Sequence, residues 1–358
     1  MLKSCNHKTA RKRTRQVIIF RDTAANSRYF TGMWWKFVVV VVFANGMIFD
    51  APAAERATPR KVEGSVPSPK PVPLMQAIPL PKDEISFQWN GVELTRYYFG
   101  HDLNRPFLYP IIGPSGRSLT RMGHPHDPET HSHHNSVWIS HRDLNGLNFW
   151  EDRGKVRIVH KRILRLDDGP EAASVSVLNA WTSDTGKVLL NEYRTITVQN
   201  VSQSDGSWML LIDLQFEAEK EPAAFGKTPF GLIGVRMAKT IGVNDGGGTI
   251  RNSEGGVNEA GCFWKPARWV DYSGPITARA IEGISLMDHP QNPDHPSVFH
   301  VRNDGWMGIS LTFDKPRTIE PKAPLRLRYG LYVHDAKPST RHLEERWKKF
   351  AELPLAGK

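Results

Sequence analysis

Short runs in which apolar and polar residues alternate recur along the chain, and they constrain its fold more than any other feature. A period of two places the apolar side chains of an extended segment on one face, which can be buried while the other face meets water. Examples are I-S-F-Q-W from Ile85, A-S-V-S-V-L from Ala173, E-Y-R-T-I-T-V from Glu192 and M-G-I-S-L-T-F from Met307. Turn signals such as Asn90-Gly91 separate these runs. The pattern predicts an all-β fold, a large antiparallel β-sandwich.

Only one segment has convincing helical periodicity. Within residues 339–353, Leu343, Trp347 and Phe350 recur at the spacing that places them on one helix face. We expect this short C-terminal helix to cap one end of the domain. The chain has no repeat of fixed period, no glycine-rich phosphate loop after a strand and no G-x-S-x-G elbow.

Residues 1–54 are predicted to be a signal peptide. Lys36 precedes an apolar stretch of 13 residues, and Ala51-Pro52-Ala53-Ala54 offers the small residues of a cleavage site. This stretch is shorter than the about 20 apolar residues that span a bilayer. Residues 1–32 form an unusually long polar segment, so we expect the true start at Met33. The mature protein is expected to be periplasmic or secreted, without a stable membrane anchor.

Seven prolines between residues 55 and 83 predict a linker, because proline lacks a backbone donor and restricts the chain. Residues 84–354 would then form a single β-sandwich domain.

The positive charge of the chain is concentrated before this domain. The net charge is +10, but residues 1–54 hold nine basic and two acidic residues, which leaves +3 for residues 55–358. We therefore expect no nucleic-acid partner. Removal of the leader also removes Cys5 and leaves Cys262, so neither an internal disulfide nor a cysteine metal cage is expected.

Six of the fourteen histidines fall between residues 124 and 141. If this run is extended, alternation places His131 and His133 on one face and His134 and Trp138 on the other, so His133 and His134 reach one pocket only where the chain bends. Imidazole exchanges protons near neutral pH and ligates transition metals.

Three interpretations of this segment remain open. The histidines are structural, or His131 and His133 ligate a divalent metal ion together with a carboxylate such as Asp127 or Glu129. In the third interpretation, His133 or His134 exchanges protons or hydrogen bonds with the hydroxyls of a sugar-like ligand, while Trp138 or Trp150 stacks on its ring.

A second segment, residues 236–292, combines long polar loops with indoles and acids, a composition that tends to line sites. The alternative is a surface loop packed by its own aromatic residues. Outside it, Glu192 is either the base of a pocket or an exposed strand acid, and Arg105 lies either at the mouth of a pocket or in a turn. The candidate ligand-binding residues are Arg105, Trp138, Asn145, Arg236, Asn252, Trp269, Tyr272 and Asn292.

Several long motifs occur in a fixed order. They include R-P-F-L-Y-P-I-I-G-P-S-G-R from Arg105, H-S-H-H-N-S-V-W-I-S-H-R-D-L-N-G from His131, T-P-F-G-L-I-G-V-R from Thr228, N-S-E-G-G-V-N from Asn252 and W-V-D-Y-S-G-P from Trp269. Through them the chain resembles the PmoA-like family of exported bacterial proteins, labelled "methane oxygenase PmoA", over about residues 85–335. The membrane subunit of methane monooxygenase is a multi-span helical protein, whereas this chain has strand signals and no mature apolar segment of spanning length.

The PmoA-like family is similar in architecture to galactose-mutarotase-like supersandwich proteins, which bind sugars on a concave sheet. The resemblance implies a carbohydrate or oligosaccharide ligand, with His133, His134 or His289 as the acid and Glu192 or Asp271 as the base. The His motif and the late catalytic Glu of the mutarotases have no matching context here, so the resemblance implies the kind of pocket and not epimerase chemistry. The alternatives are a His-ligated metalloprotein, as the family label implies, and a non-catalytic carbohydrate-binding module.

Overall fold

A computed structural model describes residues 71–202 and 204–355 of the chain. The signal peptide, the predicted start at Met33 and most of the predicted linker lie outside these residues. Within the described part, no helix has both the length and the apolar character that crossing a membrane requires.

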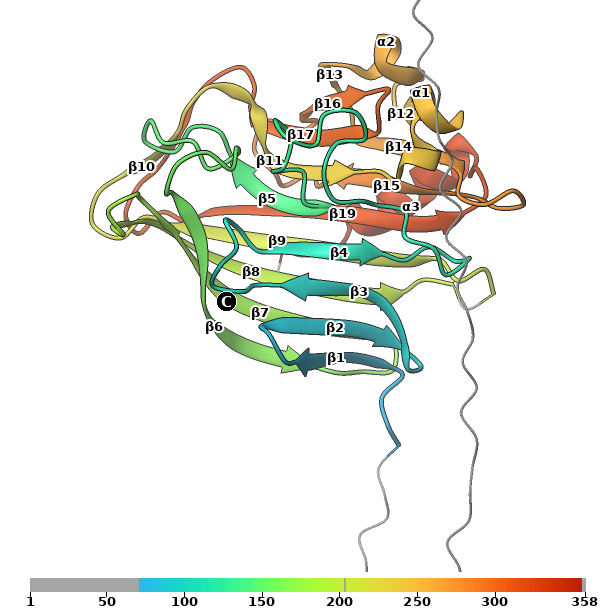
Figure 1. Cartoon of the computed structure of the whole chain (residues 1–358), viewed down its shortest axis with the longest axis horizontal. Coiled ribbons are helices and arrows are strands. Elements are labelled where there is room, and N and C mark those ends of the chain that lie inside the picture. The colour runs from blue at the N-terminus through green and yellow to red at the C-terminus, as the bar shows by residue number, and fades with distance from the viewer. Residues whose placement is uncertain (1–70, 203, 356–358) are drawn as a thin grey trace, which may run out of the picture. The chain divides into compact units, whose positions relative to one another are not determined.

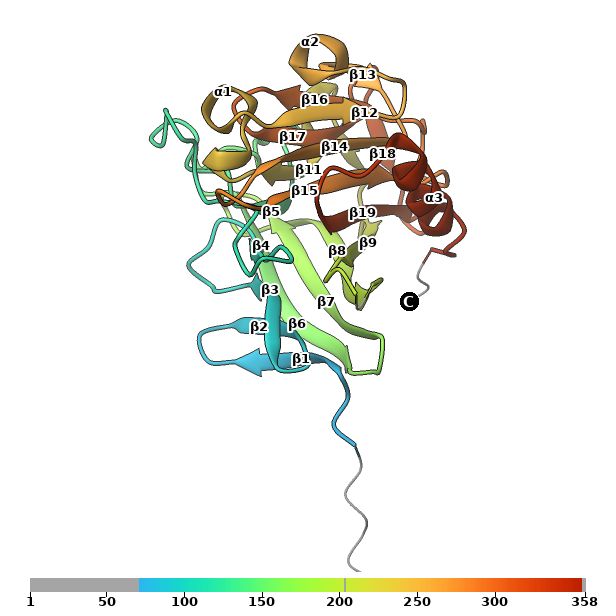
Figure 2. The same ribbon diagram turned by 90° about the vertical axis from the view of Figure 1, so that its right-hand side faces the viewer.

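Two large sheets form the fold, and every strand pairing that defines them is antiparallel (Figures 1 and 2). The front sheet contains, in spatial order, β1 (Met75–Leu80), β2 (Glu84–Trp89), β3 (Val92–Tyr98), β4 (Phe107–Ile111), β5 (Val137–His141), β11 (Thr228–Arg236), β17 (Trp306–Thr312), β16 (Val298–Arg302) and β13 (Lys265–Pro266). The back sheet contains β12 (Thr249–Asn252), β14 (Trp269–Pro275), β15 (Ile281–Asp288), β19 (Leu325–Asp335), β9 (Trp208–Glu217), β8 (Val188–Asn200), β7 (Ala172–Thr182) and β6 (Arg157–Asp167). The predicted all-β sandwich is confirmed.

Few other elements accompany the sheets. A two-stranded ribbon joins β10 (Ala223–Phe225) to β18 (Arg317–Ile319), and the short helical turns are η1 (Lys239–Ile241), α1 (Val243–Gly246) and α2 (Asn258–Cys262). The expected C-terminal helix is α3 (Thr340–Ala351), whose first turn is capped by the Ser339 hydroxyl accepting from the His342 amide at 3.2 Å. Leu343 and Phe350 bury the apolar face of this helix.

The domain begins earlier than predicted, because β1 lies inside the stretch that we interpreted as linker. Within the front sheet this strand neighbours β2 and forms the edge, and Met75 at its start also bridges to Gly169. An edge strand tolerates proline because one side of its backbone has no neighbouring strand to bond. Pro79 occupies such a position opposite Ile85.

One face of the front sheet packs in the core between the sheets, and the other carries a separate aromatic cluster. In β5, Val137 and Ile139 belong to the core, whereas the intervening Trp138 packs with Phe107, Trp150 and Trp306 on the opposite face. This alternation follows from the pleat, which points successive side chains to opposite faces. The front sheet therefore presents an aromatic surface away from the core.

Candidate functional site

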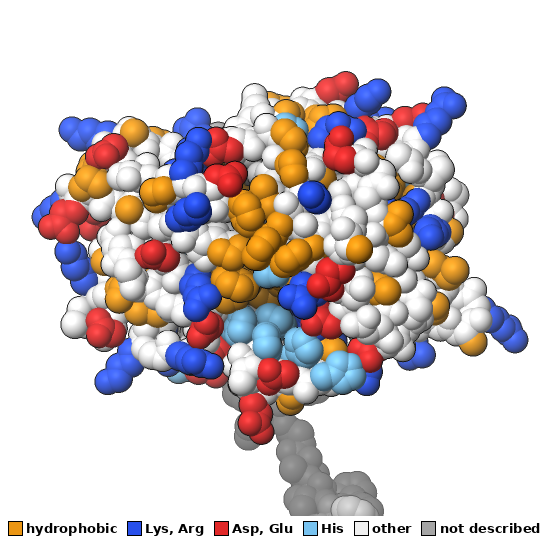
Figure 3. All heavy atoms as spheres, turned by 90° about the horizontal axis from the view of Figure 1, so that it is seen from above, with side chains coloured by type: hydrophobic (Ala, Val, Ile, Leu, Met, Phe, Trp, Pro, Cys, Tyr) orange, Lys and Arg blue, Asp and Glu red, His pale blue; other side chains and the backbone are white. Residues whose placement is uncertain are grey.

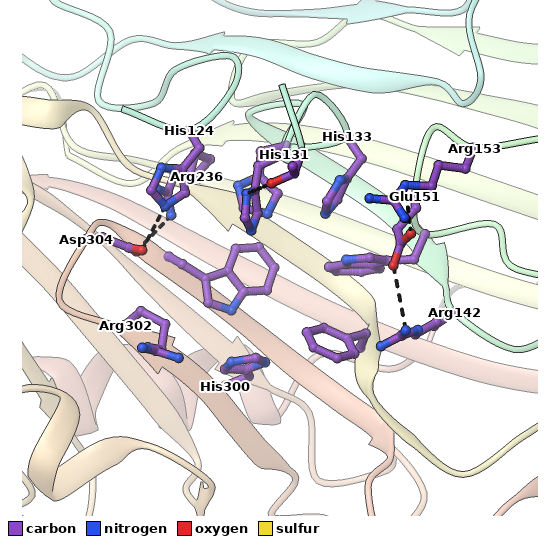
Figure 4. A pocket seen from close by; sticks show the side chains of 15 residues that line it. His124, His131, His133, Arg142, Glu151, Arg153, Arg236, His300, Arg302 and Asp304 are labelled. Carbon is purple, nitrogen blue, oxygen red and sulfur yellow. Dashed lines mark hydrogen bonds and ion pairs between the residues drawn. The ribbon is translucent and has the colours of Figure 1, made fainter. Parts of the chain in front are cut away.

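A cavity of about 500 Å³ lies over this aromatic surface. The space-filling view shows histidine side chains gathered beside hydrophobic ones in a hollow of the surface (Figure 3). The wall comes from the β4–β5 loop, the β5–β6 loop, and strands β11, β16 and β17. The lining residues are His124, Thr130, His131, His133, His134, Arg142, Trp150, Glu151, Arg153, Phe230, Arg236, His300, Arg302, Asp304 and Trp306 (Figure 4).

The chain bends between the histidines and strand β5. Residues 128–133 form turns, the His134 amide donates to the His131 carbonyl at 3.2 Å, and Ser136 has a φ of 59° in the left-handed region. The side-chain alternation of an extended strand is therefore interrupted. As a result, His133 and His134 both line the cavity.

His124, His131, His133 and His134 form a compact group, here called the histidine cluster. The ring centroids of His133 and His134 are 4.6 Å apart, those of His131 and His134 are 5.0 Å apart, and those of His124 and His131 are 4.8 Å apart. The cluster forms one wall of the cavity (Figure 4).

Arg105 supports this wall from beneath. Its side chain is buried and donates to Asn135 Oδ1 at 2.7 Å and to the carbonyls of Phe149 and Trp150 at 3.1 and 3.0 Å. It also pairs with Asp152 at 2.8 Å. One guanidinium thus joins the β4–β5 loop to the β5–β6 loop. One of our two interpretations placed Arg105 at the mouth of a pocket, but the structure places it beneath the wall.

The floor of the cavity is aromatic. The ring centroids of Trp138 and Trp306 are 5.4 Å apart, and those of Trp150 and Trp306 are 5.7 Å apart. His134 stacks on Trp306 with centroids at 5.3 Å and an interplanar angle of 12°. Trp138 is almost completely buried, so it supports the floor, whereas the half-buried Phe230 lines the cavity beside Trp150.

A polar chain connects the histidine cluster to the β16–β17 turn. The backbone amides of His126 and Asp127 donate to His124 Nδ1 at 3.1 Å, so the proton of this ring is on Nε2, which donates to Asp304 Oδ2 at 2.9 Å. Asp304 Oδ1 accepts from the buried Arg236 at 2.9 Å. Burial opposes ionisation of Asp304, but Arg236 and His124 offset it and hold the pKa of this carboxyl below its usual value.

Three buried imidazoles of the cavity wall, those of His133, His134 and His300, are held in the neutral form. Burial, with a further contribution from the Arg105 charge, lowers the pKa of His133 to about 4. Burial also lowers the pKa of His300 to about 4 and that of His134 well below its usual value. A neutral imidazole has one donor and one acceptor nitrogen, so these rings can both donate hydrogen bonds to hydroxyl groups and accept hydrogen bonds from them.

Charged side chains border two ends of the cavity. Arg142 and Arg153 lie 3.7 and 3.5 Å from Glu151, and the Arg142 guanidinium also lies 5.2 Å from the Phe230 ring centroid. At another point, Arg302 pairs with Glu259 at 2.8 Å. Arg142, Glu151 and Arg153 are here called the arginine rim.

A family model described as "Family of unknown function (DUF6807)" matches residues 84–348. The chain belongs to this family. A solved structure of a GalM/aldose epimerase homologue from C. elegans is similar over 74% of this chain and 99% of its own, with 8% sequence identity and a TM-score of 0.33. No curated protein matches the chain. The PmoA-like label stays a prediction, because these comparisons return a family without an assigned function.

Of the second predicted segment of this DUF6807 protein, only Arg236 lines the cavity. Tyr272 supports the site from behind, since its hydroxyl donates to the Asn303 carbonyl at 3.1 Å and accepts from the Val243 amide at 3.1 Å. Asn252 instead closes its own loop, accepting from the Gly256 amide at 2.7 Å. We predicted that the two segments line one cleft together. In the structure, the histidine segment instead shares its cavity with β16 and β17, and residues 252–292 do not line it.

Trp269, His289 and Asn292 lie away from the cavity because helix α3 and strand β19 hold them. Trp269 Nε1 donates to Glu344 at 2.8 Å, and His289 Nε2 lies 3.0 Å from the Leu353 carbonyl. Asn292 donates to the Arg328 carbonyl at 2.8 Å and accepts from the Arg328 amide at 2.8 Å. Their polar atoms stabilise the back of the domain.

The two carboxylates predicted as bases are also elsewhere. Asp271 accepts from His334 Nε2 and Arg251 Nη2, both at 2.8 Å, and although burial opposes ionisation, these partners lower its pKa to about 2. Glu192 lies in the core between the sheets, where it accepts from Trp181 Nε1 at 2.7 Å and Arg194 Nε at 2.6 Å. Neither group lines the cavity.

Asn145 belongs to a turn and not to the cavity wall. It has a φ of 53°, is followed by Gly146 with a φ of 82°, and accepts from the Ala224 amide at 2.7 Å. Asparagine and glycine adopt left-handed backbone more readily than other residues, which explains this pair.

The described residues do not support the metal hypothesis. Among the described residues, no group of three or more His, Cys, Asp or Glu side chains is arranged to hold a metal ion. The rings of His131 and His133 are stacked at 5.6 Å, and His131 Nδ1 is engaged by Asp127 at 3.0 Å.

Several cavity residues escaped the sequence analysis. His300 and Arg302 alternate with core residues in V-F-H-V-R, and Trp306 follows the Asn303-Asp304-Gly305 turn. Charged and aromatic residues at alternate positions of a strand next to that turn were the available signal. Glu151 and Arg153 gave no comparable pattern.

Proposed function

We propose that this protein binds a carbohydrate or sugar-derived compound in the cavity over the front sheet. The observation that carries the proposal is the combination of an aromatic floor with a wall of neutral imidazoles and guanidiniums. A sugar ring has apolar faces that pack on aromatic rings, and a periphery of hydroxyls that donate and accept hydrogen bonds. Pockets of this size bind small ligands in the same way, with aromatic and apolar surfaces for contact and a few polar groups that fix the orientation of the ligand.

The floor continues beyond the cavity at Trp264, which supports a ligand of more than one sugar unit. Trp264 is 46% exposed, an unusual state for an indole, and has a φ of 53°. It stacks on Phe263 with centroids 4.4 Å apart, and lies 6.3 Å from the His300 ring of the cavity wall. An oligosaccharide placed in the cavity would reach this exposed indole.

The cavity also contains groups for proton transfer to and from a bound sugar. General acid–base chemistry requires a proton acceptor and a donor close to the same ligand. His133, which is neutral near pH 7, and the Glu151 carboxylate line the same cavity, so either group can take a proton from a sugar hydroxyl as the base and, once protonated, return it as the acid. We assign the acid–base pair to these two residues, in place of Glu192, Asp271 and His289.

The predicted leader and the motif resemblance extend the proposal to the cellular location of the protein and to its family relationship. An export signal is predicted before the domain, so we propose that binding takes place in the periplasm or outside the cell. The ordered motifs described above support a PmoA-like kinship, with the galactose-mutarotase-like kind of pocket that it implies.

The test is isothermal titration calorimetry of the purified protein with a panel of neutral and acidic mono- and disaccharides. We expect at least one member to bind, and we expect His300→Ala and Phe230→Ala to weaken that binding at least about tenfold, which is 1.4 kcal/mol. His342→Ala, on helix α3, is the matched control and should bind as the unmodified protein does. Failure of the whole panel to bind, or equal binding by all variants, would contradict the proposal. Turnover of a bound sugar distinguishes an enzyme from a binding module.

A further inference from the structure

We infer that the ligand carries an anionic group, a carboxylate or a phosphate or sulfate ester, which is held by the arginine rim. This inference rests on the proposed function and names the substrate class of the same cavity.

The first argument is the balance of charge around the cavity. Four arginines and two acids line it. Asp304 neutralises Arg236 at 2.9 Å, and Arg302 has Glu259, outside the wall, at 2.8 Å. The arginine rim is different, because Arg142 and Arg153 share the single carboxylate of Glu151. This end of the cavity therefore carries one positive charge in excess.

Two nearby groups, Asp152 and His133, do not cancel this charge. Asp152, next in sequence to Glu151, is paired with the buried Arg105 at 2.8 Å. The nearby imidazole of His133 is neutral near pH 7, since burial and then the Arg105 charge lower its pKa to about 4. Titration of His133 therefore leaves this charge unchanged near neutral pH.

The second argument is the hydrogen-bonding capacity of the rim. The distances of Arg142 and Arg153 from Glu151, 3.7 and 3.5 Å, are longer than N–H···O hydrogen bonds of about 2.7 to 3.2 Å. N–H groups of both guanidiniums remain available to a ligand. A planar guanidinium matches the paired oxygens of a carboxylate or a phosphate.

The third argument is position. Arg142 is held over the Phe230 ring, which lines the cavity, at 5.2 Å. Figure 4 shows Arg142 and Arg153 on either side of Glu151 at one end of the cavity, with His133 close by. A sugar ring that packs on the floor would direct an acidic substituent toward this end.

The experiment compares sugars that differ in whether C6 carries a neutral hydroxyl or an anionic group. D-galactose is matched with D-galacturonate, and D-glucose with D-glucuronate and glucose 6-phosphate, by calorimetry at low salt and at high salt. We expect an acidic member to bind about tenfold or more tightly than its neutral partner, because hydrogen bonds to charged groups are the stronger class. The preference should shrink at high salt, since the rim is exposed. Whether the uronate or the phosphate binds more tightly distinguishes the two anion classes.

The variants Arg142→Gln and Arg153→Gln, alone and combined, test the assignment. We expect the double variant to bind the acidic sugar no more tightly than the neutral one, and to keep the melting temperature of the unmodified protein. Arg341→Gln, an exposed arginine on helix α3 paired with Glu345, is the matched control and should keep the preference for the acid.

The outcomes separate the two proposals. Equal affinity for neutral and acidic sugars, or a preference that survives in the double variant, overturns the anionic group and leaves sugar binding intact. Acetate or inorganic phosphate binding as tightly as the sugar acids overturns the sugar acid as the ligand. If no sugar of either kind binds, the proposed function fails, and this inference fails with it.

Discussion

His124 Nε2 lies 2.9 Å from Asp304 Oδ2, and this contact joins two loops that are 180 residues apart in sequence. Asp304 also pairs with Arg236, a guanidinium that is completely buried. The shape of the cavity between these loops therefore depends on one partly exposed carboxylate.

Replacement of this carboxylate should destabilise the protein. In Asp304→Asn, the charge of Arg236 remains buried without its counter-ion, and we expect a loss of about 2 to 4 kcal/mol in the free energy of unfolding. Denaturant unfolding measures it. Glu221→Gln removes a carboxylate from an exposed ion pair with Lys187 and should cost about 1 kcal/mol or less. Equal losses in the two variants would contradict this account.

Stability should fall as the pH is lowered from about 6.5 toward 4. The pKa values of His133, His141 and His300 are lowered by burial to about 4 from 6.5, so in this window the unfolded chain binds protons that the folded protein does not. The stabilising contribution is complete above pH 6.5 and is lost as the pH approaches 4. Unfolding midpoints at several pH values give the slope. His300→Gln should flatten it and replacement of the exposed His101 should not; the reverse pattern would count against the assignment.

Metal removal should leave the protein unchanged. The described residues offer no group of three or more metal-ligating side chains, and His131 Nδ1 is already engaged by Asp127. We expect dialysis against a chelator to change neither the melting temperature nor sugar affinity. Stoichiometric zinc or copper in the purified protein, together with a lower melting temperature after chelation, would revive the metalloprotein alternative.

Trp264→Ala should weaken the binding of a disaccharide more than that of a monosaccharide. The exposed indole lies beyond the His300 wall, where only a longer ligand reaches it. We expect a loss of about 0.5 to 1.5 kcal/mol for the disaccharide, the range of a single aromatic contact. Calorimetry with both sugars measures the difference. Ile281→Ala, an exposed apolar residue of β15, is the control, and an equal loss for the two sugars would argue against an extended floor.

Glu151→Gln should separate binding from chemistry. Removal of the acid leaves Arg142 and Arg153 without a shared partner, so an acidic sugar should bind more tightly. Any turnover should fall about 100-fold or more, because the carboxylate of the assigned acid–base pair is lost. Glu345→Gln on helix α3 should change neither quantity. Weaker binding of the acidic sugar by Glu151→Gln would show that Glu151 contacts the ligand favourably.

The sequence predicted the strands and the terminal helix better than the site. Strands such as β7 and β8 alternate regularly, and that local pattern is sufficient to identify them. The histidine cluster was recognised by its density, but the shared pocket of His133 and His134 depends on the turn at residues 128–133, where the His134 amide donates to the His131 carbonyl, and no alternation rule shows this turn.

The second segment was assigned to the cavity for a reason that proved insufficient. Trp269 and His289 are of the types that line sites, yet helix α3 and the residues directly after it supply their partners, and that packing was not visible from the sequence. Conversely, the period of β16 places His300 and Arg302 on one face without showing whether that face meets the core or the cavity. Only the order of strands in the sheet decides this.

Strands β16 and β17 place the cavity residues His300 and Trp306 directly beside the core residues Val301 and Met307. Neighbours in the sequence are therefore under different constraints. The ligand constrains His300 and Trp306, whereas packing between the two sheets constrains Val301 and Met307. Ligand preference can drift at every second position of these strands while the positions between them keep the domain folded.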